Sequence, residues 1–272
     1  MIKSEHKNIH SSVIIGENTT IDCEKVTIGK YSRIGDNVKI KCKELIIGDH
    51  LYMANGVEIG RGGCNGPNSI VKIGNGVGIF ENVVINPSEP VEIGDNCGIG
   101  ADVMIWTHGA WLDITKGFPS DFGPVTIEND VWLPARCIVL PNVSIGANSV
   151  IGIASIVNKN IPPGSLAAGS PCKILKENHY PKQLSNESLS KLVGDILDGW
   201  CALINFKAEH TFNVNYDKLT NTIYLEQPYG ITTYNVINKT IKGHSNPLSE
   251  DLRDYLRRRG IKIFTDNKFK SI

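Results

Sequence analysis

The 272-residue sequence is poor in aromatic residues, has no net charge and contains no long apolar run. Lys+Arg and Asp+Glu both total 28, and this balance argues against a nucleic-acid partner and against an acidic disordered chain. No stretch approaches the roughly 18 apolar residues of a transmembrane helix. Residues 1–6 also lack the apolar core of a signal peptide. We therefore expect a globular protein without a membrane span.

The cysteines show no pairing pattern. The seven cysteines are an odd number, widely scattered and without a Cys-x-x-Cys pair. Such a pattern favours free buried thiols, which are typical of a reducing compartment. The sequence thus predicts a cytoplasmic protein.

The shortage of aromatic residues is confined to one part of the chain. Residues 1–176 hold 22 of the 27 glycines but only 8 of the 19 aromatic residues, whereas residues 177–272 hold 5 glycines and 11 aromatic residues. The two parts are therefore expected to have differently packed cores. We predict two domains, 1–176 and 177–272.

A six-residue repeat fills the first part. From Ile127 the chain reads IENDVW, LPARCI, VLPNVS, IGANSV, IGIASI and VNKNIP, and stretches from Ile28, Ile47, Ile73 and Ile93 fall into the same frame. A helix would need spacings of three and four. One aliphatic residue in six suits a short strand plus a tight corner, where Gly and Asn supply positive φ angles. Stacked coils of this kind form a triangular prism around a ladder of aliphatic side chains.

Departures from an 18-residue coil locate two insertions. The spacing is 18 residues from Ile127 to Ile145, but 26 from Ile47 to Ile73 and 34 from Ile93 to Ile127. The longer insertion begins at about Thr107, and long loops on a rigid scaffold are usually functional. His108 stands at its start, where the chain leaves the prism. An imidazole there suits the general base of an acyl transfer, although a single surface hydrogen bond is the plainer interpretation.

Residues 124–176 resemble the hexapeptide-repeat acyltransferases, in particular galactoside and maltose acetyltransferases and polysaccharide O-acetyltransferases. The matching segments read PVTIENDVWL, SIGANSVIG, VNKNIPPG and AAGSPCKILK. The resemblance implies a mainly β fold, a left-handed parallel β-helix of hexapeptide repeats, to which the sequence adds a small C-terminal α+β domain. It also implies a homotrimer that uses acetyl-CoA as acyl donor, with no metal, and His108 as the general base.

The resemblance further implies where coenzyme A binds, in the groove between two prisms. Lys159 and Lys173, with Lys176 as a weaker third, are expected to meet its phosphates. Ala135 and Ala154 are expected to contact the pantetheine arm. The alternative is that these lysines only solvate the last coil.

The remaining site candidates follow from position. The backbone N–H of Trp132 is a candidate oxyanion donor, as in the related O-acetyltransferases, or else the ring only covers the prism edge. Trp106 and Trp111 flank His108 and are candidates to stack on a sugar. Asn82 and Asn86 are weaker candidates for contact with the acceptor. The ring of His108 is expected to be oriented by Asp102, by Asp113 or by a backbone carbonyl.

The second part follows other periods. A 3–4 apolar spacing predicts a helix from Ser185 to about Leu203, and Ser249 begins a second helix with an acidic start and a basic end. Strands are expected at 211–216, 222–226, 231–237 and 261–264. We recognise no catalytic motif in this domain.

These observations predict an acetyl-CoA-dependent O-acetyltransferase acting on a carbohydrate hydroxyl, with capsule or O-antigen among the expected acceptors. One alternative keeps the fold and acylates an amine, as in amino-sugar N-acyltransferases or antibiotic acetyltransferases. A zinc hydratase would need three converging imidazoles, a pattern that His50, His108, His179, His210 and His244 do not show. The third alternative is a non-catalytic binding protein.

Overall fold

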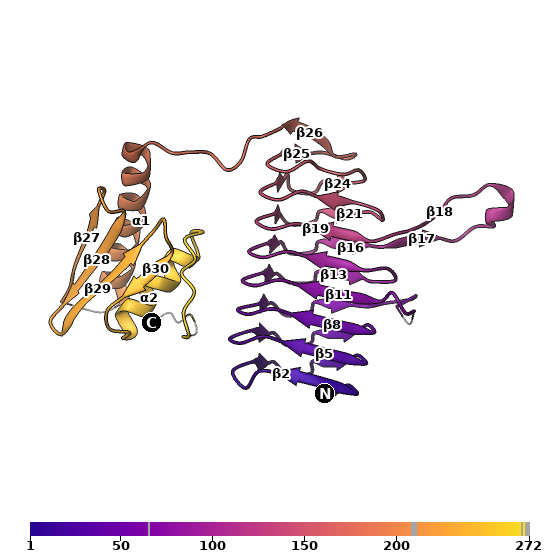
Figure 1. Cartoon of the computed structure of the whole chain (residues 1–272), viewed down its shortest axis with the longest axis horizontal. Helices are drawn as coiled ribbons and strands as arrows, with labels where there is room; N and C mark the ends of the chain where they lie inside the picture. The colour runs from indigo at the N-terminus through magenta and orange to yellow at the C-terminus, as the bar shows by residue number, and fades with distance from the viewer. Residues whose placement is uncertain (65, 208–210, 268, 270–272) are drawn as a thin grey trace. The chain divides into compact units, whose positions relative to one another are not determined.

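The computed structural model describes residues 1–64, 66–207, 211–267 and 269. The chain forms two compact units, Met1–Lys182 and Gln183–Ile272. The first unit is a stack of coils with three flat faces, which Figure 1 shows as successive rungs from β2 to β26. This is the predicted left-handed parallel β-helix, and the expected mainly β fold is confirmed.

Each face of the prism is one sheet, and we name the faces A, B and C. Face A contains β1 (Ile2–Lys3), β4 (Thr20–Asp22), β7 (Lys39–Lys41), β10 (Glu58–Ile59), β13 (Val84–Asn86), β16 (Met104–Trp106), β21 (Ile138–Val139) and β24 (Ile156–Val157). Face B contains β2 (His6–Ile9), β5 (Lys25–Ile28), β8 (Glu44–Ile47), β11 (Ile70–Ile73), β14 (Val91–Ile93), β19 (Val125–Ile127) and β22 (Ser144–Ile145). Face C contains β3 (Ile14–Ile15), β6 (Arg33–Ile34), β9 (Tyr52–Met53), β12 (Gly78–Ile79), β15 (Gly98–Ile99), β20 (Trp132–Leu133), β23 (Val150–Ile151), β25 (Leu166–Ala168) and the antiparallel β26 (Lys173–Lys176).

The aliphatic residue of each hexapeptide points into the prism. On face A, Ile21, Ile40, Ile59, Ile85 and Ile105 lie in register from coil to coil, and each is at most 1% exposed. The inward side chains of the three faces pack against one another within each coil and against those of the coils above and below. The core is therefore a narrow column, which explains why few aromatic residues fit in this unit.

The corners depend on residues that tolerate the left-handed region. Corner residues such as Asn37, Asn82 and Asn96 have φ angles of 57–58°. Neighbouring corners also approach closely: a β-carbon on Gly74 would lie 2.4 Å from Asp95 Oδ1. The Gly and Asn of the repeat thus occupy the positions that other residues would strain.

Both insertions leave the prism at the corner between faces A and B. The shorter one connects β10 to β11. The longer one forms a hairpin of β17 (His108–Ala110) and β18 (Ser120–Phe122), closed by the 3₁₀ turn Ile114–Lys116, and Figure 1 shows it projecting from the stack. The sequence predicted a loop here, without strands.

The second unit packs two helices and a four-stranded antiparallel sheet around its own core. Its elements are α1 (Asn186–Lys207), β27 (Asn213–Asp217), β28 (Thr222–Gln227), β29 (Gly230–Asn235), β30 (Thr240–Lys242) and α2 (Pro247–Arg257). Ser185 caps α1 as predicted, because its Oγ accepts from Ser188 N at 3.1 Å. The second helix begins earlier than predicted, since Asn246 provides its cap.

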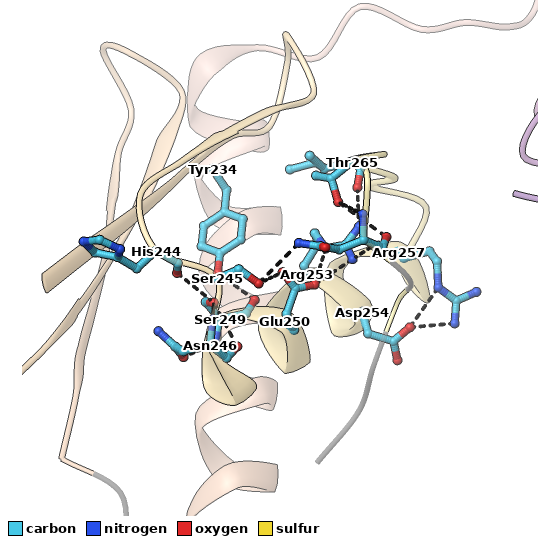
Figure 2. A network of polar contacts seen from close by, with 12 residues as sticks. Tyr234, His244, Ser245, Asn246, Ser249, Glu250, Arg253, Asp254, Arg257 and Thr265 are labelled. Atoms are coloured by element: carbon cyan, nitrogen blue, oxygen red, sulfur yellow. Dashed lines mark hydrogen bonds and ion pairs between the residues drawn. The ribbon is translucent and has the colours of Figure 1, made fainter. Parts of the chain in front are cut away.

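The predicted strand at 261–264 is wrong. This segment forms no strand, and instead the carbonyl of Ile263 accepts a 3.1 Å hydrogen bond from Arg253 Nη1. Arg253 is fully buried and also binds Glu250 Oε2 through Nε at 2.7 Å (Figure 2). A buried guanidinium needs several acceptors, and the chain after α2 supplies them in place of pairing with the sheet.

Candidate active site

His108 is held at the surface of the prism by its neighbour in the chain. Thr107 is fully buried, its Oγ1 donates to the carbonyl of Asn86 at 2.8 Å, and the same atom accepts from Glu89 N at 3.0 Å. These two bonds tie the start of the long insertion to the coil before it. The half-buried ring of His108 is therefore carried by the rigid scaffold.

A chain of hydrogen bonds assigns the tautomer of His108. Asn86 Nδ2 donates to the carbonyl of Gly62 at 3.1 Å, so Asn86 Oδ1 faces Ser88 and accepts from Ser88 Oγ at 3.2 Å. Ser88 has only one hydroxyl proton, which this bond uses. Its oxygen must then accept from His108 Nδ1, 2.9 Å away. The network therefore favours the tautomer with the proton on Nδ1, which leaves a lone pair on Nε2.

The partners of this network are buried beneath the ring. Asn86 is 1% and Ser88 is 7% exposed. The buried thiol of Cys64 lies 3.6 Å from Asn86 Oδ1 and donates to it. Burial raises the pKa of the Cys64 thiol, which keeps the proton that this bond needs. Asn86 therefore has fixed partners for both ends of its amide.

Three residues confine the His108 ring. Phe122, which pairs with His108 across the hairpin, stacks on the ring with centroids 5.4 Å apart and an angle of 24°. Trp106 meets it edge-on at 6.3 Å. A β-carbon on Gly63 would lie 2.7 Å from Ser88 Oγ and 3.5 Å from His108 Cε1. The shorter insertion thus passes directly beside the ring.

The carboxylates that the sequence considered as orienting partners have other contacts. Asp113 accepts from Thr115 N and Thr115 Oγ1 at 3.0 and 2.7 Å, and the first of these caps the 3₁₀ turn. Asp102 accepts from Asn82 Nδ2 at 3.3 Å and lies 3.8 Å from Arg136 Nε. Ser88 is the partner that the structure shows. Its position was readable from the repeat, since it precedes His108 by one 20-residue coil.

The two asparagines predicted to reach the acceptor lie in different places. Asn82 belongs to the corner between faces C and A, away from the A–B corner that carries His108. Asn86 is buried under His108, and its amide is used by Gly62 and Ser88. Neither asparagine is placed at the exposed side of the ring. Trp106 contacts the ring, whereas Trp111 projects from the hairpin and is 93% exposed.

The predicted coenzyme A contacts gather at the last coils. Ala135 and Ala154 stack at the corner between faces C and A, where Ala154 N donates to the carbonyl of Ala135 at 3.0 Å. Lys173 and Lys176 are exposed at the ends of β26, and Lys173 pairs with Ala168 near the same corner. Lys159 is exposed at the A–B corner. None of these residues contacts His108 within the described parts of one chain.

The backbone of Trp132 is not free to hold an oxyanion. Its N–H donates to the carbonyl of Ser149 at 3.0 Å, as part of the ladder of face C. A rung of the prism uses that proton, so the oxyanion role predicted for this N–H requires the ladder bond to be given up. The indole ring points outward and is 57% exposed.

Two classes of site have no counterpart in the described residues. No group of three or more His, Cys, Asp or Glu side chains in that part of the chain could hold a metal ion, and His210 lies outside it. No helix in the described ranges has the length and apolarity to cross a bilayer.

Comparison with known proteins relates the last coils to bacterial transferases. The family model described as bacterial transferase hexapeptide (six repeats) matches residues 124–152. The galactoside O-acetyltransferase of Escherichia coli (strain K12) is 52% identical over 54 residues, which are 20% of this chain and 27% of that protein. The chain spans about a quarter to a third of the length of the curated relatives that it matches first.

Solved structures give similar neighbours. A galactoside acetyltransferase in complex with coenzyme A is 31% identical, covers 52% of this chain and 70% of its own, and superposes with a TM-score of 0.42. A polysialic acid O-acetyltransferase is 21% identical over 68% of this chain and 93% of its own, with a TM-score of 0.48.

Proposed function

Because the chain belongs to the hexapeptide-repeat family of bacterial transferases, we propose that it is an acetyl-CoA-dependent O-acetyltransferase acting on a carbohydrate hydroxyl. One observation carries the proposal. The hydrogen bonds from Gly62 through Asn86 and Ser88 keep the proton of His108 on Nδ1, so Nε2 is a base at the prism surface.

The reaction proceeds by direct transfer. Nε2 of His108 removes the proton of the acceptor hydroxyl while its oxygen attacks the thioester carbonyl. The tetrahedral intermediate collapses, the acetyl group stays on the acceptor oxygen, and the thiolate of coenzyme A leaves with the proton from the imidazolium. Ser88 accepts from Nδ1–H throughout and stabilises the imidazolium. Backbone N–H groups are the expected oxyanion donors, and that of Trp132 is not among them.

The assembly in this proposal is a homotrimer, with each active site shared between two prisms. Two apolar surfaces support an assembly. Val84, Met104, Ile138 and Ile156 form an outward apolar column in register on face A. The hairpin exposes five large hydrophobic side chains, more than a solvated loop normally carries: Trp111, Leu112, Ile114, Phe118 and Phe122.

The proposed trimer also explains why the cofactor residues are remote from His108 in one chain. Coenzyme A would lie in the groove between prisms, with its phosphates at Lys159, Lys173 and, less directly, Lys176, and its pantetheine arm along Ala135 and Ala154. The exposed indole of Trp132 would line this groove, and Trp106 and Trp111 would contact the sugar. The cysteines carry thiols in place of disulfide bonds, which supports a cytoplasmic location.

Replacing His108 tests the proposal. We expect His108→Ala to lower acetyl transfer to a saccharide acceptor by about 10²–10⁴-fold, because the general base is removed. Coenzyme A binding, measured by calorimetry, should be retained. The matched control is His10→Ala, a distant exposed histidine of the prism. Full activity in His108→Ala would contradict the mechanism, and transfer only to amine acceptors would favour the N-acyltransferase alternative.

A further inference from the structure

A groove lies on face A of the prism, toward the N-terminal coils from the A–B corner that carries His108. Its volume is about 490 Å³, which is within the usual range of roughly 300–1,000 Å³ for ligand sites. Strands β1, β4, β7 and β10 form its floor, and Gly60 and Arg61 of the loop after β10 line the end that is nearest to His108. Nothing in the mechanism above uses this groove.

Basic side chains outnumber acidic ones in the groove. The charged residues of its lining are Lys3, Lys39, Lys41, Arg61, Asp22 and Glu58. Arg61 is paired with Glu58 at 2.9 Å. The three lysines are exposed and form no ion pair with any described residue. Three ammonium groups beside one remaining carboxylate therefore give the groove a positive field, although the chain as a whole has no net charge.

The groove is aligned with the active site by the register of face A. Lys3, Asp22, Lys41, Gly60, Asn86 and Trp106 lie in one column across successive strands. At the usual spacing between strands, Lys41 lies about 14 Å and Lys3 about 24 Å from Trp106. Gly60 has no side chain to interrupt the column between Lys41 and the rung of Asn86.

The loop at the upper end connects the two sites directly. Arg61 lines the groove, the carbonyl of Gly62 accepts from Asn86, and Gly63 lies against the His108 ring. A ligand that fills the groove therefore ends beside the base. A single sugar cannot span this distance, so the arrangement suits an extended chain.

We propose that this groove binds an acidic polysaccharide and positions hydroxyl groups of the polymer near His108. This inference rests on the proposed acetyl transfer. Lysine ammonium groups would meet the carboxylates of the polymer, while Asp22 and Thr20 would accept or donate hydrogen bonds to its hydroxyls. A carboxylate on the floor disfavours the closely spaced phosphates of a nucleic acid, which needs a broad basic surface.

Binding is tested separately from catalysis. The probes are polygalacturonate fragments, neutral dextran fragments of similar length and a single-stranded DNA oligomer, each titrated into the full-length protein at low and high salt. We expect polygalacturonate alone to bind, and Lys39→Glu/Lys41→Glu to weaken it by at least about tenfold. The matched control is Lys7→Glu/Lys25→Glu, exposed lysines of face B strands β2 and β5 that should leave affinity unchanged.

Other results overturn either the inference or the proposed function on which it rests. Equal loss in the two double variants would mean a general charge effect, and equal binding of DNA would mean a site for any polyanion. Loss of the native oligomeric state in the face A variant alone would mean that the groove is covered by a second copy. If polygalacturonate fails to bind while His108-dependent transfer to small saccharides persists, only the groove is refuted. Binding at the groove without any acetyl transfer would refute the proposed function instead.

Discussion

At the scale of single residues, the protonation of His108 in the proposed mechanism depends on the single hydroxyl proton of Ser88. Ser88 uses its only proton on Asn86, so it must accept from His108. Asn86 can play this part because its own amide is oriented by a backbone carbonyl. The sequence predicted His108 as the general base from its place at the start of an insertion and from the family resemblance. It did not identify Ser88, since a serine in a coil has many roles and only its position one rung below the ring selects this one.

Substituting Ser88 tests that assignment. We expect Ser88→Ala to lower kcat by about ten- to hundredfold with little change in the affinity for acetyl-CoA, because Nδ1 loses the acceptor that orients the ring. The pH dependence of kcat should shift as well, since the imidazolium loses its stabilising partner. Ser88→Thr keeps the hydroxyl and should recover most of the activity. An unchanged pH profile in Ser88→Ala would show that Ser88 has only a packing role.

At the scale of elements, the hexapeptide coil explains most of the fold. Each rung needs one inward aliphatic residue and corners that accept positive φ, and both requirements are visible in a single sequence. The structure of the two insertions could not be predicted in this way, because their sequences do not follow the hexapeptide repeat. Their lengths were predictable, whereas the strands β17 and β18 and the packing of the shorter loop beside His108 were not.

The shorter insertion provides a test of its contact with the ring. Gly63 has a φ of 88° and faces Ser88 and His108, so we expect Gly63→Ala to displace the ring and reduce kcat by about tenfold or more. Gly62→Ala is the matched control, because a β-carbon there meets nothing within 4 Å. Activity and coenzyme A binding are measured for both variants. Equal kcat values for the two would mean that the loop does not define the site.

At the scale of the whole molecule, two units with separate cores share one chain. The prism is stabilised by its aliphatic column, and the second unit by a core that includes Trp200 and a buried polar network. In that core the indole N–H of Trp200 donates to Asp251 at 2.8 Å. The phenol of Tyr234 donates to the carbonyl of Ser249 at 2.7 Å (Figure 2). Burial raises the pKa of Tyr234, which keeps that donor protonated.

The buried guanidinium of Arg253 tests the independence of the units. We expect Arg253→Met to lower the free energy of unfolding of the second unit by about 3–5 kcal/mol, because Glu250 is left buried without its partner. Hydrogen exchange should rise in peptides of β28, β29 and α2 and stay unchanged in the prism. Arg258→Met is the control, since its ion pair with Asp254 is 42% exposed on the arginine side and its loss should matter little. Faster exchange throughout the prism would mean that the two units unfold together.

The sequence by itself determined the prism of stacked hexapeptides and the place in the chain where the insertion that begins with His108 leaves it. This was possible because each hexapeptide of a stacked repeat carries its own inward aliphatic residue and its own corner residues, so the pattern is visible within a few residues of sequence. Only the tertiary structure decided the partners of His108, the occupied N–H of Trp132 and the irregular segment that binds Arg253. These depend on which atoms from distant coils meet and which hydrogen bonds they already make. The tertiary structure also explains the scarcity of aromatic residues in the first unit, because its core column is narrow, and it shows that a chain without net charge gathers in one groove three lysines that form no ion pair with a described residue.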